Sequence, residues 1–97
     1  KGIVDIKTTT DIKGFTYSAK KYSYDVQCYL YCQLYNKSYE DFTFLVIDKG
    51  SLDIGVWECT EDFYLQGKRK TKEALTQFEN FFIKGHDLDN YIIKGKL

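Results

Sequence analysis

The residues with the clearest chemical potential lie in the first third of the chain. Asp5 and Lys7 belong to a short β-branched run, and because side chains alternate along a strand, both should leave the same face. Further on, Gln27 and Tyr31 are four residues apart, which is one turn of a helix. A carboxylate beside an ammonium, with an amide and a phenol in reach, could bind a hard divalent cation and act on a phosphate ester.

The residues Asp5-Ile6-Lys7 resemble the (D/E)-x-K signature of the PD-(D/E)XK nuclease superfamily. Gln27 and Tyr31 resemble the Q-x-x-x-Y helix motif found in its exodeoxyribonuclease VIII-like and phage-type branch. The resemblance covers roughly residues 1–85 and implies a restriction-endonuclease-like core. It also implies a deoxyribonuclease that depends on Mg²⁺ or Mn²⁺, works as an exonuclease on DNA ends in recombination or repair, and has DNA as its partner. A second copy of the chain or a recombination protein is a further partner that this branch suggests.

The resemblance assigns a role to each of these residues. Asp5 would bind the metal ion through its carboxylate and Ile6 through its carbonyl, while Lys7 would orient or deprotonate the attacking water. Lys7 would also offset the charge that accumulates in the transition state. Gln27 and Tyr31 would hydrogen-bond the DNA backbone or the water network.

Two further groups of residues are candidates for binding DNA. Thr8 and Thr9 follow Lys7 at the end of the predicted strand and could contact the DNA backbone. The cations Lys68, Arg69 and Lys70 form a local cluster that could contact phosphates. Such a run is also typical of a solvated helix face, and Arg69 and Glu73 have the spacing of a surface ion pair.

The family needs another aspartate on the strand before Asp5, and the chain begins too late to hold that strand. We therefore expect a nuclease core that is incomplete at its N-terminus, with weak metal binding and little or no activity of this chain alone. Two alternatives stay open. The chain could be a non-catalytic relative that binds nucleic acid or protein, or a structural domain in which Asp5 and Lys7 form only an ion pair.

The pattern of apolar residues predicts the elements that must position these groups. We expect a strand over 2–7, a weaker helix over 11–21 and a helix over 23–36 that begins at Ser23 as its N-cap and repeats Val26, Leu30 and Leu34. The run 42–47 is apolar on both faces except at Thr43, which is typical of a central strand covered on two sides.

The second half of the chain is predicted to continue with a hairpin and a long helix. Residues 52–58 should pair antiparallel with the central strand and point Leu52, Ile54 and Val56 inward. A helix should begin near Thr60 and extend to about residue 84, with a stripe formed by Tyr64, Thr71, Leu75, Phe78 and Phe82. The cluster 91–93 could add a short strand or pack loosely.

Length and composition set the outer limits. A chain of 97 residues with 43% hydrophobic residues is one folded domain over 1–97, of the α/β or α+β class with a small mixed sheet flanked by helices. Its 14 basic and 14 acidic residues cancel, so no overall positive field indicates a nucleic-acid partner. The residues Cys28, Cys32 and Cys59 lack zinc or disulfide spacing and are predicted to be small core residues in a reducing compartment, the cytoplasm. No run approaches the ~20 apolar residues of a membrane span.

Overall fold

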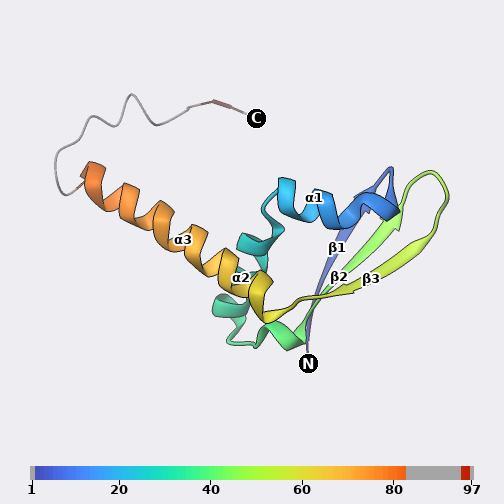
Figure 1. Ribbon diagram of the computed structural model, residues 1–97, viewed down its shortest axis with the longest axis horizontal. Coiled ribbons are helices and arrows are strands. Elements are labelled where there is room, and N and C mark those ends of the chain that lie inside the picture. The colour runs from blue at the N-terminus through green and yellow to red at the C-terminus, as the bar shows by residue number, and fades with distance from the viewer. Residues whose placement is uncertain (1, 83–94, 97) are drawn as a thin grey trace.

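A computed structural model describes residues 2–82 and 95–96 of the chain, with the side chains of 81 and 82 left out. Its elements are β1 (Ile3–Thr9), the 3₁₀ turn η1 (Ile12–Gly14), α1 (Phe15–Lys21), α2 (Tyr24–Tyr35), the 3₁₀ turn η2 (Tyr39–Asp41), β2 (Phe42–Asp48), β3 (Ile54–Glu58) and α3 (Glu61–Phe82). The chain is therefore a small mixed α+β domain, as predicted (Figure 1). None of the described helices is long and apolar enough to cross a membrane.

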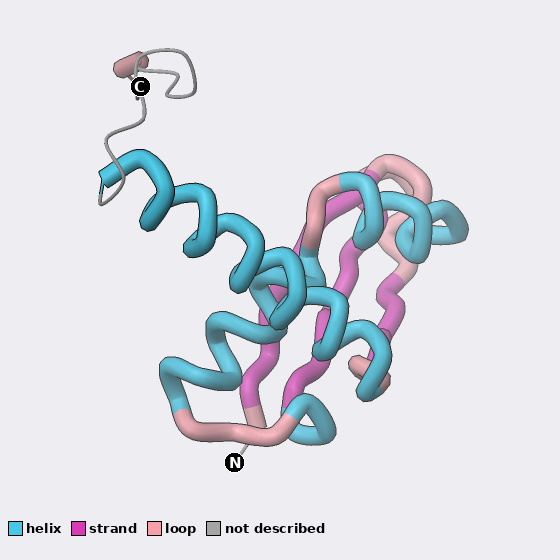
Figure 2. The backbone as a smooth tube through the Cα atoms, turned by 60° about the vertical axis from the view of Figure 1, so that its left-hand side comes forward, coloured by secondary structure: helices cyan, strands magenta, loops and turns pink. Residues whose placement is uncertain are grey.

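The three strands form one mixed sheet in the order β1-β2-β3. β1 is parallel to β2, with Asp5 opposite Phe44 and Lys7 opposite Val46. β2 is antiparallel to β3. A parallel pair needs a long crossover, and the segment with α1 and α2 supplies it. Figure 2 shows these helices in front of the strands, so the crossover also covers one face of the sheet.

The core lies between that sheet face and the helices. Phe42, Phe44 and Val46 point inward from β2, and Phe15 packs over them from α1. The rings of Phe42 and Phe44 lie 5.0 Å apart, and those of Phe15 and Trp57 lie 4.9 Å apart. Because β2 is paired on both edges and buries every second side chain, it is the central strand that the sequence predicted.

The other face of the sheet carries the apolar residues of β3 that were predicted to point inward. Leu52, Ile54 and Val56, which were expected to point inward, are 73%, 66% and 63% exposed. Val56 pairs with Leu45 and Ile54 pairs with Ile47, and these β2 residues lie on the face opposite the buried Phe44 and Val46. The inward positions of β3 therefore belong to its alternate residues, including Trp57.

We call this second face the open sheet face. Its apolar residues are Val4, Ile6, Leu45, Ile47, Ile54 and Val56. Leu45 and Ile47 are half-buried by their neighbours, but the described helices lie on the opposite side of the sheet (Figure 2). The expectation that β2 is covered on two sides is therefore wrong for the part of the chain that the structure describes.

Helix α2 departs from the prediction in its start and in its buried face. Ser23 adopts a left-handed conformation with φ 54° and makes no side-chain cap, so its predicted N-cap role is wrong. The carboxylate of Asp25 accepts a hydrogen bond from Val26 N at 2.9 Å instead. The predicted apolar stripe is also wrong, because Leu30 and Leu34 are 46% and 71% exposed. The buried positions are Asp25, Cys28 and Cys32, a set that sequence hydropathy ranks below the leucines.

Helix α3 begins where the sequence predicted. Thr60 Oγ1 accepts a hydrogen bond from Phe63 N at 3.2 Å, which caps the first turn. The first turns of α3 pack on α2, whereas the later turns extend away from the sheet (Figure 1). Of the predicted stripe, Tyr64 and Thr71 are half-buried, but Leu75 and Phe78 are 57% and 55% exposed. The predicted stop near residue 85 and the cluster 91–93 lie outside the described residues.

Candidate functional site on the edge strand

Lys7 is the centre of the candidate site. Its Nζ lies 3.0 Å from Asp5 Oδ2 and donates a hydrogen bond of 2.7 Å to Gln27 Oε1. The same nitrogen lies 4.3 Å from the centre of the Tyr24 ring, which makes it a cation–π contact. The side chains of Lys7 and Asp5 are 18% and 21% exposed, so the pair is half-buried. Asp5, Lys7 and Gln27 therefore lie together, and their catalytic roles stay a prediction.

Two local periodicities bring these groups together. Asp5 and Lys7 share a face of β1 because they are two residues apart, and that face points towards the helices. Tyr24 and Gln27 are three residues apart in the first turns of α2, so they lie on one side of that helix. The crossover then lays that side of α2 over β1.

The Asp5 carboxylate is incompletely satisfied. Its Oδ2 is buried and accepts no hydrogen bond. Lys7 Nζ lies 3.0 Å from this oxygen, which is within ion-pair distance, but the two groups are not aligned as a hydrogen bond requires. The contact still compensates the charge, but a buried oxygen without a directed donor has capacity for another cation or donor.

Tyr31 does not take part in this cluster. Its ring stacks on Phe42 at 6.2 Å with an interplanar angle of 12°. Phe42 is paired with Ile3 at the start of β1, whereas Lys7 lies nearer the strand's other end. One turn of α2 therefore separates the amide of Gln27, at the site, from a phenol ring that packs beside the core.

The two threonines after Lys7 face opposite sides of the sheet. Thr8 is exposed, and Thr9 is half-buried on the side of Asp5 and Lys7. Thr9 Oγ1 accepts a hydrogen bond from Asp11 N at 3.1 Å and so closes the turn after β1. A hollow of about 260 Å³ lies beside this turn, lined by Thr8, Thr9, Thr10, Phe15, Ser18, Tyr22, Tyr24 and Lys49. The contact of Thr8 and Thr9 with DNA stays a prediction.

The three cations of α3 that were predicted to bind DNA have different surroundings. Arg69 forms an exposed ion pair with Glu73 at 2.9 Å, as its spacing predicted. Lys70 reaches Asp25, so a phosphate would have to compete with a carboxylate for its ammonium. Lys68 is half-buried and lines a shallow depression on the helix with Arg69 and Lys72. Binding of DNA by Lys68, Arg69 and Lys70 stays a prediction.

The three cysteines belong to the core. Cys28, Cys32 and Cys59 are all free thiols and buried. Contact with the Cys59 thiol, together with burial, raises the pKa of Cys28, and burial raises the pKa of Cys32 to about 12. Both thiols are therefore neutral near pH 7 and poor nucleophiles or metal ligands. They pack as the small core residues that the sequence predicted.

The residues around Asp5 only partly fit the divalent ion that the resemblance implies. Asp5 offers a carboxylate oxygen that lacks a hydrogen bond, which suits a hard cation. Within the described ranges, however, no three His, Cys, Asp or Glu side chains gather as a metal site. The carbonyl of Ile6 and one carboxylate do not amount to a complete site for Mg²⁺ or Mn²⁺, so no catalytic step through a metal follows from these residues.

Sequence reasoning missed Tyr24 and Asp25. Tyr24 precedes Gln27 by three residues, so its place beside Gln27 could have been found from helical spacing. Asp25 lies in the first turn of α2, where helical position alone explains a negative charge, but it is buried against α3. Its burial depends on Lys70, which lies 45 positions further along the chain (70 − 25), and no local pattern connects the two residues.

No family model matches this chain, and no curated protein matches it either.

Proposed function

We propose that this chain carries the (D/E)-x-K portion of a metal-dependent deoxyribonuclease with a restriction-endonuclease-like core, an exonuclease that acts on DNA ends. The observation that supports the proposal most is the contact of Lys7 with both Asp5 and Gln27. These three residues come from the two motifs of the resemblance, and twenty positions separate Lys7 from Gln27. Their convergence on one half-buried face is what a nuclease site of this kind requires.

The chain's own residues would have the following roles. Asp5, through its carboxylate, and Ile6, through its carbonyl, would be two ligands of Mg²⁺ or Mn²⁺, and the further ligands would have to come from outside the described residues. When bound, the ion would polarise the phosphoryl group and activate a water molecule. The Lys7 ammonium would offset charge on the phosphoryl oxygens. Gln27 uses its carbonyl oxygen for Lys7, which leaves two amide N–H groups to donate to a phosphate.

A second candidate function is a non-catalytic module of the same fold. The observation in its favour is that Lys7 already has Asp5, Gln27 and Tyr24 as partners. A lysine held in this way can simply fix α2 on β1. In that case neither a metal ion nor DNA should disturb the cluster.

Paramagnetic broadening by Mn²⁺ in NMR spectra tests the proposal, because it detects even millimolar binding. We expect the backbone amide signals of Asp5, Ile6 and Lys7 and the side-chain amide of Gln27 to broaden first. The variant Asp5→Asn should lose this effect. The matched control Asp53→Asn removes an exposed acid in the hairpin loop and should leave the broadening unchanged.

A second titration uses a short DNA duplex in the presence of Ca²⁺. Under the proposal, the side-chain signals of Lys7 and Gln27 shift, and they shift less in Asp5→Asn. The nuclease proposal is wrong if Mn²⁺ broadens the same signals equally in Asp5→Asn and wild type. Lys7 and Gln27 signals that stay unchanged with both Mn²⁺ and DNA would instead establish the non-catalytic module.

A further inference from the structure

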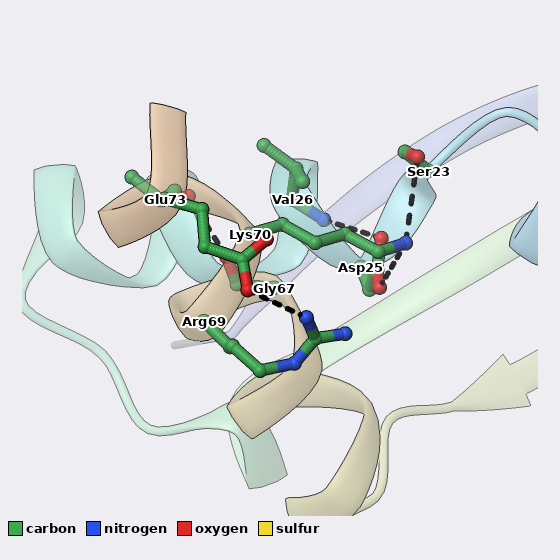
Figure 3. A network of polar contacts seen from close by, with 8 residues as sticks. Ser23, Asp25, Val26, Gly67, Arg69, Lys70 and Glu73 are labelled. Atoms are coloured by element: carbon green, nitrogen blue, oxygen red, sulfur yellow. Dashed lines mark hydrogen bonds and ion pairs between the residues drawn. The ribbon is translucent and has the colours of Figure 1, made fainter. Parts of the chain in front are cut away.

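A buried ion pair joins α2 to α3 (Figure 3). Lys70 Nζ on α3 lies 2.8 Å from Asp25 Oδ2 and donates a longer hydrogen bond, of 3.5 Å, to Ser23 Oγ. The other oxygen of Asp25 accepts a hydrogen bond from Val26 N at 2.9 Å. The side chain of Asp25 is only 2% exposed and that of Lys70 is 33% exposed. A single carboxylate therefore connects the start of α2 with the cation of α3.

This pair is difficult to replace by solvent. A carboxylate buried to this extent needs a charged partner or several donors, and Lys70 is its only ion-pair partner among the described residues. Gly67 lies one turn before Lys70, and a Cβ atom there would overlap the carbonyl oxygen of Asp25. The close approach of the two helices and the ion pair thus occur at the same point.

The same turn of α2 also contacts the candidate site. Tyr24 directly precedes Asp25, Gln27 follows it by two positions, and both contact Lys7. Asp25 points the other way, towards α3. A rotation or shift of this turn would therefore move the ring of Tyr24 and the amide of Gln27 together. Ser23 gives this turn no side-chain cap, and the ring of Tyr24 packs on Phe15 and Phe44.

We propose that Asp25 and Lys70 are positioning residues for the site on β1. Their ion pair holds the first turn of α2 against α3, and this contact sets Tyr24 and Gln27 against Lys7. The importance of this role for catalysis rests on the proposed function. The structural coupling between the Asp25–Lys70 ion pair and the contacts of Lys7 does not. Lys70 would then serve the site by fixing α2, in place of a direct contact with phosphate.

The ring of Tyr24 gives a direct readout of the coupling. Lys7 Nζ lies over that ring, so the ring current should shift the neighbouring Cε protons of Lys7 upfield in NMR spectra. We expect Lys70→Met to lose most of this shift and to weaken the protection of the Lys7 ammonium protons by Gln27. Lys70→Arg should retain both signals. Arg69→Met is the matched control, because it removes a neighbouring cation whose ion pair is exposed.

Lys70→Met leaves a buried carboxylate unpaired and can unfold the chain. The double variant Asp25→Asn with Lys70→Met avoids that charge, and Trp57, the only tryptophan, reports the folded fraction. The proposal is wrong if the folded double variant keeps the Lys7 shift of the wild type. Because this readout uses neither metal nor DNA, it can fail while the Mn²⁺ experiment succeeds, and the reverse also holds.

Discussion

Among the described residues, two carboxylates contact a lysine, but their surroundings differ. Asp5 is 21% exposed and keeps an oxygen without a hydrogen bond, whereas Asp25 is 2% exposed and has Val26 N and Lys70 as partners. A half-buried carboxylate with spare capacity can still meet a ligand. A nearly inaccessible carboxylate whose oxygens already have partners can only stabilise the fold. Burial and partners, more than residue type, therefore separate the candidate ligand from the positioning residue.

Asp48 is a third kind of carboxylate, and it closes the hairpin. One of its oxygens accepts hydrogen bonds from Gly50 N at 2.8 Å and Ser51 N at 3.1 Å, and the other accepts one from Ile12 N at 3.2 Å. The backbone donor of Ser51, followed by those of Gly50 and Ile12, holds the pKa of Asp48 below its ordinary value of 3.8. Asp48 thus ties the turn after β2 to the turn after β1.

The lowered pKa predicts how stability depends on pH. A group whose pKa is lower in the folded state than in the unfolded state stabilises the folded protein at pH values above the unfolded-state pKa. This stabilisation is lost as the pH falls through the folded-state pKa. We expect the free energy of unfolding of the wild type to drop between about pH 5 and pH 2, and to drop less in Asp48→Asn. Urea titrations at several pH values measure this difference. Equal losses in both proteins would contradict the role given to Asp48.

At the scale of elements, the contact between α2 and α3 depends on a residue without a side chain. Gly67 is buried in the middle of a helix, where glycine is unfavourable by about 1 kcal/mol relative to alanine. The close approach of the Asp25 carbonyl explains its presence, since any Cβ would overlap that oxygen. The two helices would have to separate to accept a larger residue.

In Gly67→Ala, the higher helix propensity of alanine therefore opposes the steric overlap of its Cβ with α2. We expect packing to dominate and the free energy of unfolding to fall by about 1–3 kcal/mol, as is usual for overpacking. Ala74→Gly is the matched control on the exposed part of α3, and it should cost about 0.5–1 kcal/mol. Urea denaturation measures both values. A Gly67→Ala protein more stable than the wild type would show that propensity decides and that the helices are not in tight contact.

The whole molecule is a sheet with described helices on one face only. Val46 on the helix side is 0% exposed, whereas Val56 on the open sheet face is 63% exposed. The two residues are the same type in adjacent strands, so they compare the two faces directly. The open sheet face would need another layer to become a core, since apolar faces of sheets are normally covered.

Truncation of the two valines should have unequal effects. We expect Val46→Ala to lower the free energy of unfolding by about 2–3 kcal/mol, because it leaves a cavity between sheet and helices. Val56→Ala should lower it by less than about 1 kcal/mol, because its side chain is mostly in water. Chemical denaturation of the two variants measures the difference. Similar losses would mean that a partner or another segment covers the open sheet face.

The sequence by itself predicted the elements and the relations within them. Alternation along a strand places Asp5 and Lys7 on one face, and the apolar run of β2 indicates a central strand, whatever the rest of the chain does. The antiparallel hairpin and the start of α3 at Thr60 were predicted from turn and capping residues in the same way. Each of these features depends on neighbours within a few positions.

Only the tertiary structure decided which faces are inside. Alternation divides the residues of β3 into two sets but does not say which set meets the helices, so Ile54 and Val56 were assigned to the wrong side. The crossover through α1 and α2 covers one face of the sheet, and that choice settled the matter for all three strands. The burial of Asp25 depends on Lys70 in another helix in the same way. Local spacing determines which residues share a face of a strand or helix. Contacts between segments far apart in the chain determine which of those faces is buried.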